Sequence, residues 1–376
     1  MTTDYKSDPL IGDVVRGAVD EWKIPLDQTP EEPVYDYRKY VYRKWVFVIA
    51  CLVVTFVVVG VALKIGDTPI SFWDTYTTVW NHITGNVESK LYDYIIITLR
   101  MPRIVIGILA GAGLAVCGAV MQSTMMNPLA DPYTTGVSSG ALFGVTLGMV
   151  AGFSVTSGQM GLVFNAFIFA LIPTGVIILV SKLRNMSPTV LIMAGIAVMY
   201  IFNALTTVMK LWADPNTLSE LYTWSVGSLS LSGWDAVPYM LAVVVPGIIV
   251  MMLLSRQINV LTTGDENATA MGINVNRLRR FLMIVVALVA AVIVAFTGLI
   301  GFVGLVAPHI CRIFVGADNR FLIPASAMFG AMLLVAADLI GRTIISPSTL
   351  QVGVITAFIG GPVFLWLILR KNSRVW

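Results

Sequence analysis

Charged residues are scarce in this chain. Only 12% of its 376 residues are Asp, Glu, Lys or Arg, whereas 57% are hydrophobic. This balance excludes an ordinary soluble domain. The formal net charge of +3 is too small to indicate a nucleic-acid-binding protein. With two histidines, three cysteines and no C-x-x-C spacing, the sequence offers little material for a metal centre or a disulfide framework.

The few cysteines and histidines occupy positions that packing explains. Cys51, Cys117 and Cys311 fall in apolar surroundings, which predicts buried small hydrophobic side chains. His309 has no second metal-binding side chain spaced near it, so we expect a hydrogen-bonded core residue. The chain also lacks the G-x-x-x-x-G-K-[ST] loop and every other nucleotide-binding motif.

Long apolar stretches are abundant. Runs of about 18 or more apolar residues recur along most of the chain, and each is long enough for a membrane-spanning helix. Uniform apolar runs indicate helices rather than the alternating pattern of a membrane barrel. We therefore predict an all-α polytopic membrane protein. Its ten spans are expected at 45–63, 105–125, 139–155, 163–182, 190–210, 236–255, 281–299, 302–316, 322–341 and 352–370.

Ten spans place both termini on one side of the membrane. The segments on that side carry 18 of the 24 Lys and Arg residues, a bias that predicts cytoplasmic termini in the cell membrane. The expected domains are a polar extension at 1–44, a ten-span domain at 45–371 and a cytoplasmic tail at 372–376. The extension has no apolar core of a cleavable signal peptide. It is either a short amphipathic surface helix or a partly ordered tail, and we assign it no function.

One polar segment between two predicted spans has the start and stop signals of a small helical protrusion. In TTGDENATAMGINVNRLRR (262–280), Asp265 and Glu266 can cap and charge a helix start, and Gly272 can end the helix in the left-handed conformation. Asn274 can cap a second short helix that runs toward the next span. The small residues expected at the tip are Ala268 and Ala270. The segment is either a protrusion that enters a cleft on another protein or a solvated connecting loop.

A polar stripe follows one face of the predicted span at 190–210. It consists of Asn203, Thr206, Thr207 and Lys210, at i, i+3, i+4 and i+7, with Tyr200 one turn earlier. Such a stripe lines either a water-filled path or a helix–helix contact. We favour the path, because polar groups within a membrane are commonly functional.

Glycine and proline are concentrated around the second predicted span. Gly107 and Gly111 form a G-x-x-x-G pair, which predicts close approach of another helix backbone. The sequence NPLADP at 127–132 follows, and its two prolines must leave the helix. We expect this segment to line a break at the cytoplasmic mouth.

An ordered series of motifs carries a family resemblance. The motifs are R-x-P-R at 100–103, GAVMQ, NPLADP followed by GVSSGA, W-x-x-GSL at 224–229, GFVGLVAPH at 301–309, AADLIGR at 336–342 and GVITAFIGGPVFLWLI near the end. Together they extend over about 45–371. The chain resembles the iron-siderophore, haem and cobalamin permease family of ATP-binding-cassette (ABC) importers.

The resemblance implies a homodimeric transport subunit that catalyses no reaction itself. Its expected partners are a second copy of the chain, two cytoplasmic ABC ATPase subunits, an extracytoplasmic substrate-binding protein and membrane lipid, without nucleic acid. No cofactor is expected in this chain, because ATP and Mg would bind to the ATPase subunits. The transported solute is left open among iron-siderophore, haem and cobalamin.

The resemblance also implies site residues. For ATPase coupling they are Gly264, Asp265, Glu266, Ala268, Ala270, Met271, Gly272 and Asn274. For docking of the binding protein, which would present glutamates, they are the outward-facing Arg100, Arg103 and Arg342. For the translocation path and gate they are Asn127, Leu129, Ser187, Thr189, Tyr200, Asn203, Thr206 and Thr207. The chain departs from the family pattern at Pro188, where a small hydroxyl residue is common. No catalytic or metal-binding residues are expected.

Two other classes of function fit the sequence less well. An ion-coupled secondary carrier needs intramembrane carboxylates or broken-helix ion sites in repeated halves. Asp338 is the only obvious carboxylate in a predicted span, and its i,i+4 spacing to Arg342 allows these two residues to pair. A membrane enzyme needs a catalytic cluster, which a single histidine without paired acids does not supply.

Overall fold

The structure is a computed structural model that describes residues 31–369, except 67, 69, 155, 157, 184–186 and 346–347. The chain separates into two units, Met1–Arg43 and Lys44–Trp376. Helix α2 (Glu31–Lys64) begins in the first unit and continues into the second. The amphipathic surface helix considered for the N-terminal extension and the tail at 372–376 lie outside the described residues.

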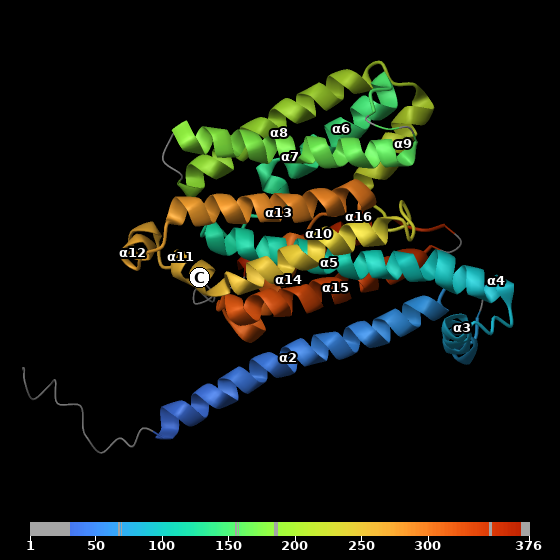
Figure 1. Ribbon diagram of the computed structural model, residues 1–376, viewed down its shortest axis with the longest axis horizontal. Helices are drawn as coiled ribbons and strands as arrows, with labels where there is room; N and C mark the ends of the chain where they lie inside the picture. Colours follow the sequence, from blue (N-terminus) through green and yellow to red (C-terminus); the bar gives the residue numbers. More distant parts are fainter. Residues whose placement is uncertain are drawn as a thin grey trace, which may run out of the picture. The chain divides into compact units, whose positions relative to one another are not determined.

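Within the described residues, ten apolar helices correspond one to one to the ten predicted spans, and Figure 1 shows how they are arranged. Seven are long enough to cross a membrane: α2, the continuous segment Lys90–Thr124, α7 (Gln159–Leu183), α8 (Pro188–Lys210), α10 (Ala236–Leu253), α13 (Val275–Thr297) and α15 (Asn319–Thr343). Three are shorter in apolar length: α6 (Val137–Ala151), α14 (Val303–Val315) and α16 (Val352–Leu369). The described part contains no strand. The predicted all-α polytopic class is therefore confirmed.

Short helices in the connections were missed from the sequence. The segment Lys90–Thr124 consists of α4 (Lys90–Asp93), a π-helical turn η1 (Tyr94–Arg100) and α5 (Met101–Thr124). The other additions are α3 (Phe72–Thr84), the 3₁₀ turn η2 (Pro132–Thr135), α9 (Pro215–Val226) and α11 (Ser255–Leu261). They are short, or polar residues interrupt their apolar ones, so no long hydrophobic run marks them. The predicted protrusion contains α12 (Asp265–Ala270).

Helix α5 forms the centre of the spanning unit. Most of its residues are buried, and it packs against α10, α13, α14 and α15 (Figure 1). The predicted close backbone approach is present at Gly111, where an added Cβ would lie 2.3 Å from the carbonyl oxygen of Gly330 on α15, whereas Gly107 lies against the side chain of Leu229. A Cβ added at Gly118 would lie 1.8 Å from the carbonyl oxygen of Gly304 on α14. Backbone therefore packs directly on backbone at both crossings.

The direction of α5 defines two ends of this unit. Its first residue follows η1, near α3 and α4, and its last turn lies beside the start of α13, next to α12 (Figure 1). We call these the α3 end and the α12 end. Cys51, Cys117 and Cys311 are free thiols that are 5%, 0% and 0% exposed. This burial confirms their predicted role as small apolar side chains.

Candidate coupling, gate and docking sites

The helix of the protrusion at 262–274 begins and ends where the sequence predicts. Helix α12 starts after Gly264, with Asp265 and Glu266 in its first turn. Gly272 adopts φ +82°, and its N–H donates to the carbonyl of Thr269 at 2.9 Å, which ends the helix. The Oδ1 atom of Asn274 then accepts a hydrogen bond from the N–H of Arg277 at 3.0 Å and caps α13.

Three details of the protrusion differ from the prediction. The second helix is not a separate short one, because α13 continues from Val275 through the span. Asp265 does not cap α12, since its carboxylate binds Arg279. Ala268 is 0% exposed and packs inside its own chain, because Ile258 and Leu261 of α11 and Val275 lie in the same hydrophobic cluster. The exposed tip is formed by Glu266, Ala270 and Met271.

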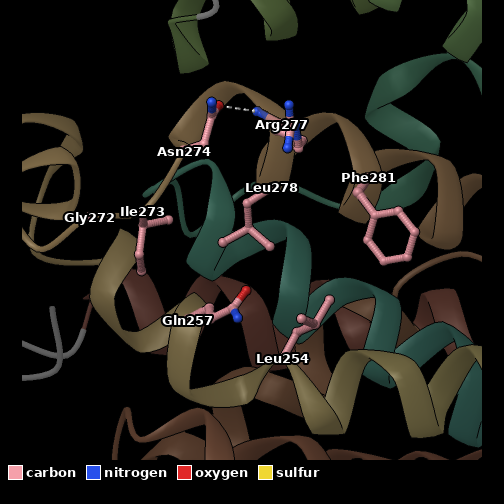
Figure 2. Close-up of a pocket in the computed structure, with 8 residues that line it drawn as sticks. All are labelled: Leu254, Gln257, Gly272, Ile273, Asn274, Arg277, Leu278 and Phe281. Carbon is pink, nitrogen blue, oxygen red and sulfur yellow. Dashed lines mark hydrogen bonds between the residues drawn. The ribbon is translucent and has the colours of Figure 1, made fainter.

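A shallow pocket lies beside the protrusion. Figure 2 shows it between α11, the turn after α12 and the first turns of α13. Its volume is about 390 Å³, and it is lined by Leu254, Gln257, Gly272, Ile273, Asn274, Arg277, Leu278 and Phe281. Its lining is mainly apolar, with polar groups at the edge of the protrusion, a composition typical of a surface that receives part of another molecule.

A buried arginine fixes the protrusion to the spanning unit. The Arg279 side chain is 0% exposed, and its Nη1 and Nη2 atoms donate to the Asp265 carboxylate at 3.0 and 2.7 Å. Its Nε atom donates to the carbonyl of Thr124 at 3.3 Å. The hydrogen bonds from Arg279 hold the pKa of Asp265 below its ordinary value, against the opposing effect of partial burial. The carboxylate is therefore ionised at neutral pH.

The predicted gate segment leaves α5 immediately after Thr124. The N–H of Asn127 donates to the carbonyl of Gln122 at 3.1 Å, which turns the chain back on the helix end. The side chain of Asn127 accepts from the N–H of Leu129 at 2.9 Å. Leu129 is 51% exposed, and Met126 has a positive φ of 47°. NPLADP thus leaves the helix as predicted, and it presents Leu129 on the surface of the chain.

Two further residues hold the gate segment. The Nε2 atom of His309 lies 2.9 Å from the carbonyl oxygen of Pro128, and the ring is 7% exposed, which confirms a hydrogen-bonded core histidine. Asp131 accepts hydrogen bonds from the N–H groups of Tyr133 and Thr134 and caps η2. Burial raises the pKa of Asp131 to about 6, against the lowering effect of these backbone bonds.

The polar stripe on α8 is only partly exposed. Tyr200, Asn203 and Thr207 lie on the surface of the chain. Thr206 is 3% exposed, and its hydroxyl donates to the carbonyl of Phe202 at 2.8 Å, so it lies on the packed side of α8 rather than in the exposed stripe. Helical spacing alone predicted Thr206 as part of the stripe, and this assignment is corrected because neighbouring helices cover that side of α8.

The other predicted gate residues lie at the start of α8. Ser187 caps this helix by accepting a hydrogen bond from the N–H of Val190 at 3.4 Å, and Pro188 occupies the first helical position. Thr189 is exposed. The Ser187 hydroxyl therefore has a structural role in this conformation.

The three predicted docking arginines gather at the α3 end, but their side chains point inward. Arg100 is 6% exposed and donates to the carbonyls of Leu63, Lys64 and Thr68. Arg103 and Arg342, whose side chains are 15% and 8% exposed, both bind Asp338, at 2.7 and 3.1 Å. The outward orientation expected for all three is therefore not observed. The last carbonyls of α2 have no partner within the helix, so they accept hydrogen bonds from Arg100. The buried carboxylate of Asp338 needs a cation, so it binds Arg103 and Arg342.

Part of this arginine cluster follows from the sequence. The i,i+4 pair of Asp338 and Arg342 is confirmed. Arg103 as a second partner of the carboxylate was missed, because 235 residues separate it from Asp338 along the chain. No spacing rule connects positions so far apart in the sequence.

The arrangement of spans, protrusion and gate segment can be compared with known proteins. Residues 51–370 match the FecCD transport family. The chain belongs to this family. The haemin transport permease of Yersinia pestis is 36% identical over 302 residues, which cover 80% of this chain and 89% of that protein. The cobalamin import permease of Halobacterium salinarum is 40% identical over 279 residues, which cover 74% of each chain.

A solved structure has the same fold. An inward-facing metal-chelate type ABC transporter superimposes with a TM-score of 0.76 at 27% identity, covering 85% of this chain and 98% of that one. FecCD proteins are the permease subunits of ABC importers for iron chelates, haem or cobalamin, and they are not enzymes. The chain is accordingly a multi-pass permease of the cell membrane.

Proposed function

We propose that two copies of this chain form the translocation pathway of an importer for a metal chelate of the iron-siderophore, haem or cobalamin class. Two cytoplasmic ABC ATPase subunits drive it, and an extracytoplasmic binding protein delivers the solute. The observation that carries the proposal is the α12 protrusion. It is a capped helix that presents Glu266, Ala270 and Met271 to the surface and is anchored in the spanning unit by Arg279.

The protrusion provides a contact site through which a separate ATPase subunit can act on the spans. The sequence contains no nucleotide-binding motif, so the energy of ATP must come from a separate subunit. A short helix with an exposed small residue, Ala270, can enter a cleft in that subunit. The adjacent pocket of about 390 Å³ offers the ATPase subunit a second, mainly apolar contact surface.

We assign the gate and the path to two surfaces. Asn127 and Leu129 from the segment after α5, with Ser187 and Thr189 from the start of α8, form the gate at the α12 end. Tyr200, Asn203 and Thr207 line the path, because they are the polar side chains of α8 that lie on the surface of the chain. In the assembled dimer this surface faces the second copy.

Docking of the binding protein belongs to the α3 end. Arg103 and Arg342 share one carboxylate, that of Asp338, so this group of three keeps a net positive charge. A positive surface attracts acidic residues of a partner and raises the association rate even where the guanidinium groups stay bonded inside the chain. Arg100 adds a third cation to the same end.

An ion-coupled secondary carrier is disfavoured by the state of Asp338. Its side chain is 2% exposed and accepts hydrogen bonds or ion pairs from Arg103 and Arg342. A carboxylate already bound by two guanidinium groups is not available to a transported cation.

Reconstitution tests the proposal. The permease is co-expressed with the cassette ATPase and binding protein of its organism, and the purified complex is placed in liposomes. We expect equal numbers of permease and ATPase subunits by native mass spectrometry. Uptake of a ferric siderophore, haemin or cyanocobalamin should require ATP and persist when ionophores collapse the ion gradients. Uptake by the permease without an ATPase would contradict the proposal.

A further inference from the structure

The buried Arg279 on α13 joins two parts of the molecule that the proposed mechanism must connect. It binds Asp265 in the first turn of α12 through two nitrogens, and it binds the carbonyl of Thr124 through the third. Thr124 is the last residue of α5, and only Met125 and Met126 separate it from the gate segment at 127–132. One guanidinium group therefore bridges the protrusion and the root of the gate segment.

A second connection reaches the same turn of α5 from the other side of the protrusion. Asn259 on α11 accepts hydrogen bonds from the backbone and side chain of Asn319, at 2.8 and 2.9 Å. The hydroxyl of Ser123 in turn donates to Asn319 at 3.0 Å. The helices before and after the loop at 262–264 are thus tied to the adjacent residues Ser123 and Thr124.

The gate segment is in turn bound to this end of α5. The N–H of Asn127 donates to Gln122, one turn back on the helix, and the Pro128 carbonyl contacts His309 on α14. The gate segment is therefore attached to α5 at one point and to α14 at another. If the last turn of α5 moves relative to α14, the distance between these two attachment points changes and the gate segment must change its conformation.

The exposures of the ion pair indicate a firm link. The Arg279 side chain is 0% exposed, whereas the Asp265 side chain is 40% exposed. Water cannot replace the carboxylate as a partner of a fully buried guanidinium group, so separating the two would leave an uncompensated charge. Moving α12 without moving Arg279 is therefore strongly unfavourable.

We propose that Arg279 is a positioning residue that transmits movement of α12 to the last turn of α5 and so to the gate segment. This inference rests on the proposed coupling of α12 to an ATPase subunit. The residue makes no contact with the solute, and it acts through Asp265 on one side and Thr124 on the other.

The test measures gate movement directly. Leu129→Cys places a thiol on the exposed part of the gate segment, and the three native cysteines are buried. In the ATPase-containing complex, in inside-out membrane vesicles, we expect ATP with vanadate to change the rate at which a membrane-impermeant maleimide labels this thiol. Adding Asp265→Asn, or Arg279→Lys, should reduce that nucleotide-dependent change by about tenfold, as expected for the loss of a charge-assisted bidentate contact.

Controls separate transmission from folding. Asp265→Glu keeps a carboxylate and should restore the response. Arg280→Gln removes the neighbouring arginine, whose Nε atom bonds only within α13 to Asn276 among the contacts described, and should leave the response unchanged. Basal hydrolysis should be unchanged in Arg280→Gln, and the response of every other variant is expressed relative to the amount of ATPase that co-purifies with it.

Two outcomes would overturn different statements. A full nucleotide response in Asp265→Asn and Arg279→Lys would reject the transmitting role and leave the proposed function intact. No response, or no bound ATPase, in the Leu129→Cys complex without further substitution would reject the proposed function and the role of Arg279 with it.

Discussion

At the scale of single residues, two of the buried charges in the described part of the chain are held in sets of opposite charges. Asp338 is 2% exposed and shared by Arg103 and Arg342, and Arg279 is 0% exposed and bound to Asp265. Because an unpaired buried charge costs several kcal/mol, these groups are only stable as sets. A substitution at one member therefore affects stability before it affects docking or transport.

Asp338→Asn should lower stability substantially. Two arginines would lose their shared anion in a buried site, which typically costs about 3–5 kcal/mol. The thermal unfolding midpoint in detergent, followed by tryptophan fluorescence, measures the effect. Asp235→Asn is the control, because Asp235 is exposed and its side chain makes no cap hydrogen bond. Equal midpoints for the two variants would contradict the prediction.

The burial of Arg100 and Arg342 changes the effect expected of charge reversal at the docking arginines. Arg100→Glu with Arg342→Glu should weaken binding of an acidic partner with little effect on folding, if both side chains face outward. Both are buried and hydrogen-bonded, so we expect the double variant to lose stability as well. Docking is therefore better tested by the salt dependence of binding-protein association.

Asp131→Asn should raise stability at neutral pH. The pKa of Asp131 is about 6 in the folded chain, against an ordinary value of 3.8. The folded state holds the proton more tightly, so stability falls as pH rises between these two values and stays reduced above them. Asn keeps the acceptor for Tyr133 and Thr134 without ionising. The gain in unfolding midpoint should be full near about pH 7.5 and vanish toward about pH 4. A gain independent of pH would contradict this assignment.

At the scale of elements, α12 has one face that packs inside the chain and one face that is exposed. Ala268 is 0% exposed and belongs to the hydrophobic cluster that includes residues of α11 and α13, whereas Ala270 is exposed. Sequence pattern treats the two alanines alike, because both are small residues near the tip. Helix geometry places the two alanines about 200° apart around the axis, at roughly 100° per residue. The fold then covers the face that carries Ala268 and leaves the face that carries Ala270 exposed.

Ala268→Trp and Ala270→Trp should therefore differ. The first overfills a packed site, which costs about 1–3 kcal/mol, and lowers the unfolding midpoint. The second leaves the midpoint unchanged and blocks entry into the ATPase cleft, so hydrolysis in the complex continues while uptake is lost. Unfolding in detergent and ATP hydrolysed per solute transported provide the two measurements. Normal uptake by Ala270→Trp would reject this face of α12 as the ATPase contact.

At the scale of the whole molecule, glycines divide the spans into tightly joined groups. Gly111 and Gly118 bring α5 into backbone contact with α15 and α14. Gly140 and Gly144 do the same for α6 with α7, where an added Cβ would lie 2.3 and 2.5 Å from carbonyl oxygens of α7. Contacts of α5 with α13 instead use side chains such as Ile293. Side-chain contacts can slide more easily than backbone contacts, so we expect the glycine crossings of α5 to stay fixed and the movement proposed above to be confined to the last turn of this helix.

Gly118→Ala tests this division. Its Cβ would lie 1.8 Å from the carbonyl oxygen of Gly304, so α5 and α14 must separate, and we expect a loss of about 1–3 kcal/mol. Gly175→Ala in α7 is the matched control, because nothing lies within 4 Å of its Cβ. That variant should be neutral or slightly stabilised through the higher helix propensity of alanine. An unfolding midpoint of Gly118→Ala equal to that of the control would contradict the tight crossing.

The sequence predicts features that depend on local pattern and misses those that depend on distant partners. Ten spans, the Gly272 terminator and the Asn274 cap follow from runs and spacings within one segment. The burial of Ala268 and Thr206 depends on which neighbour covers each face. Arg279 and Thr124 are 155 positions apart, so no local rule connects them. The inward orientation of the docking arginines has the same origin.

The enclosure of α5 has a consequence for biosynthesis. This helix is the second span to be made, yet the partners that surround it include α13, α14 and α15, which end as late as Thr343. At roughly 5–20 residues per second, a ribosome needs on the order of 10–40 s to add the intervening residues. During that interval the glycine-rich surface of α5 is exposed to lipid. The nascent chain must therefore keep α5 in the bilayer until α13, α14 and α15 have been inserted and can pack against it.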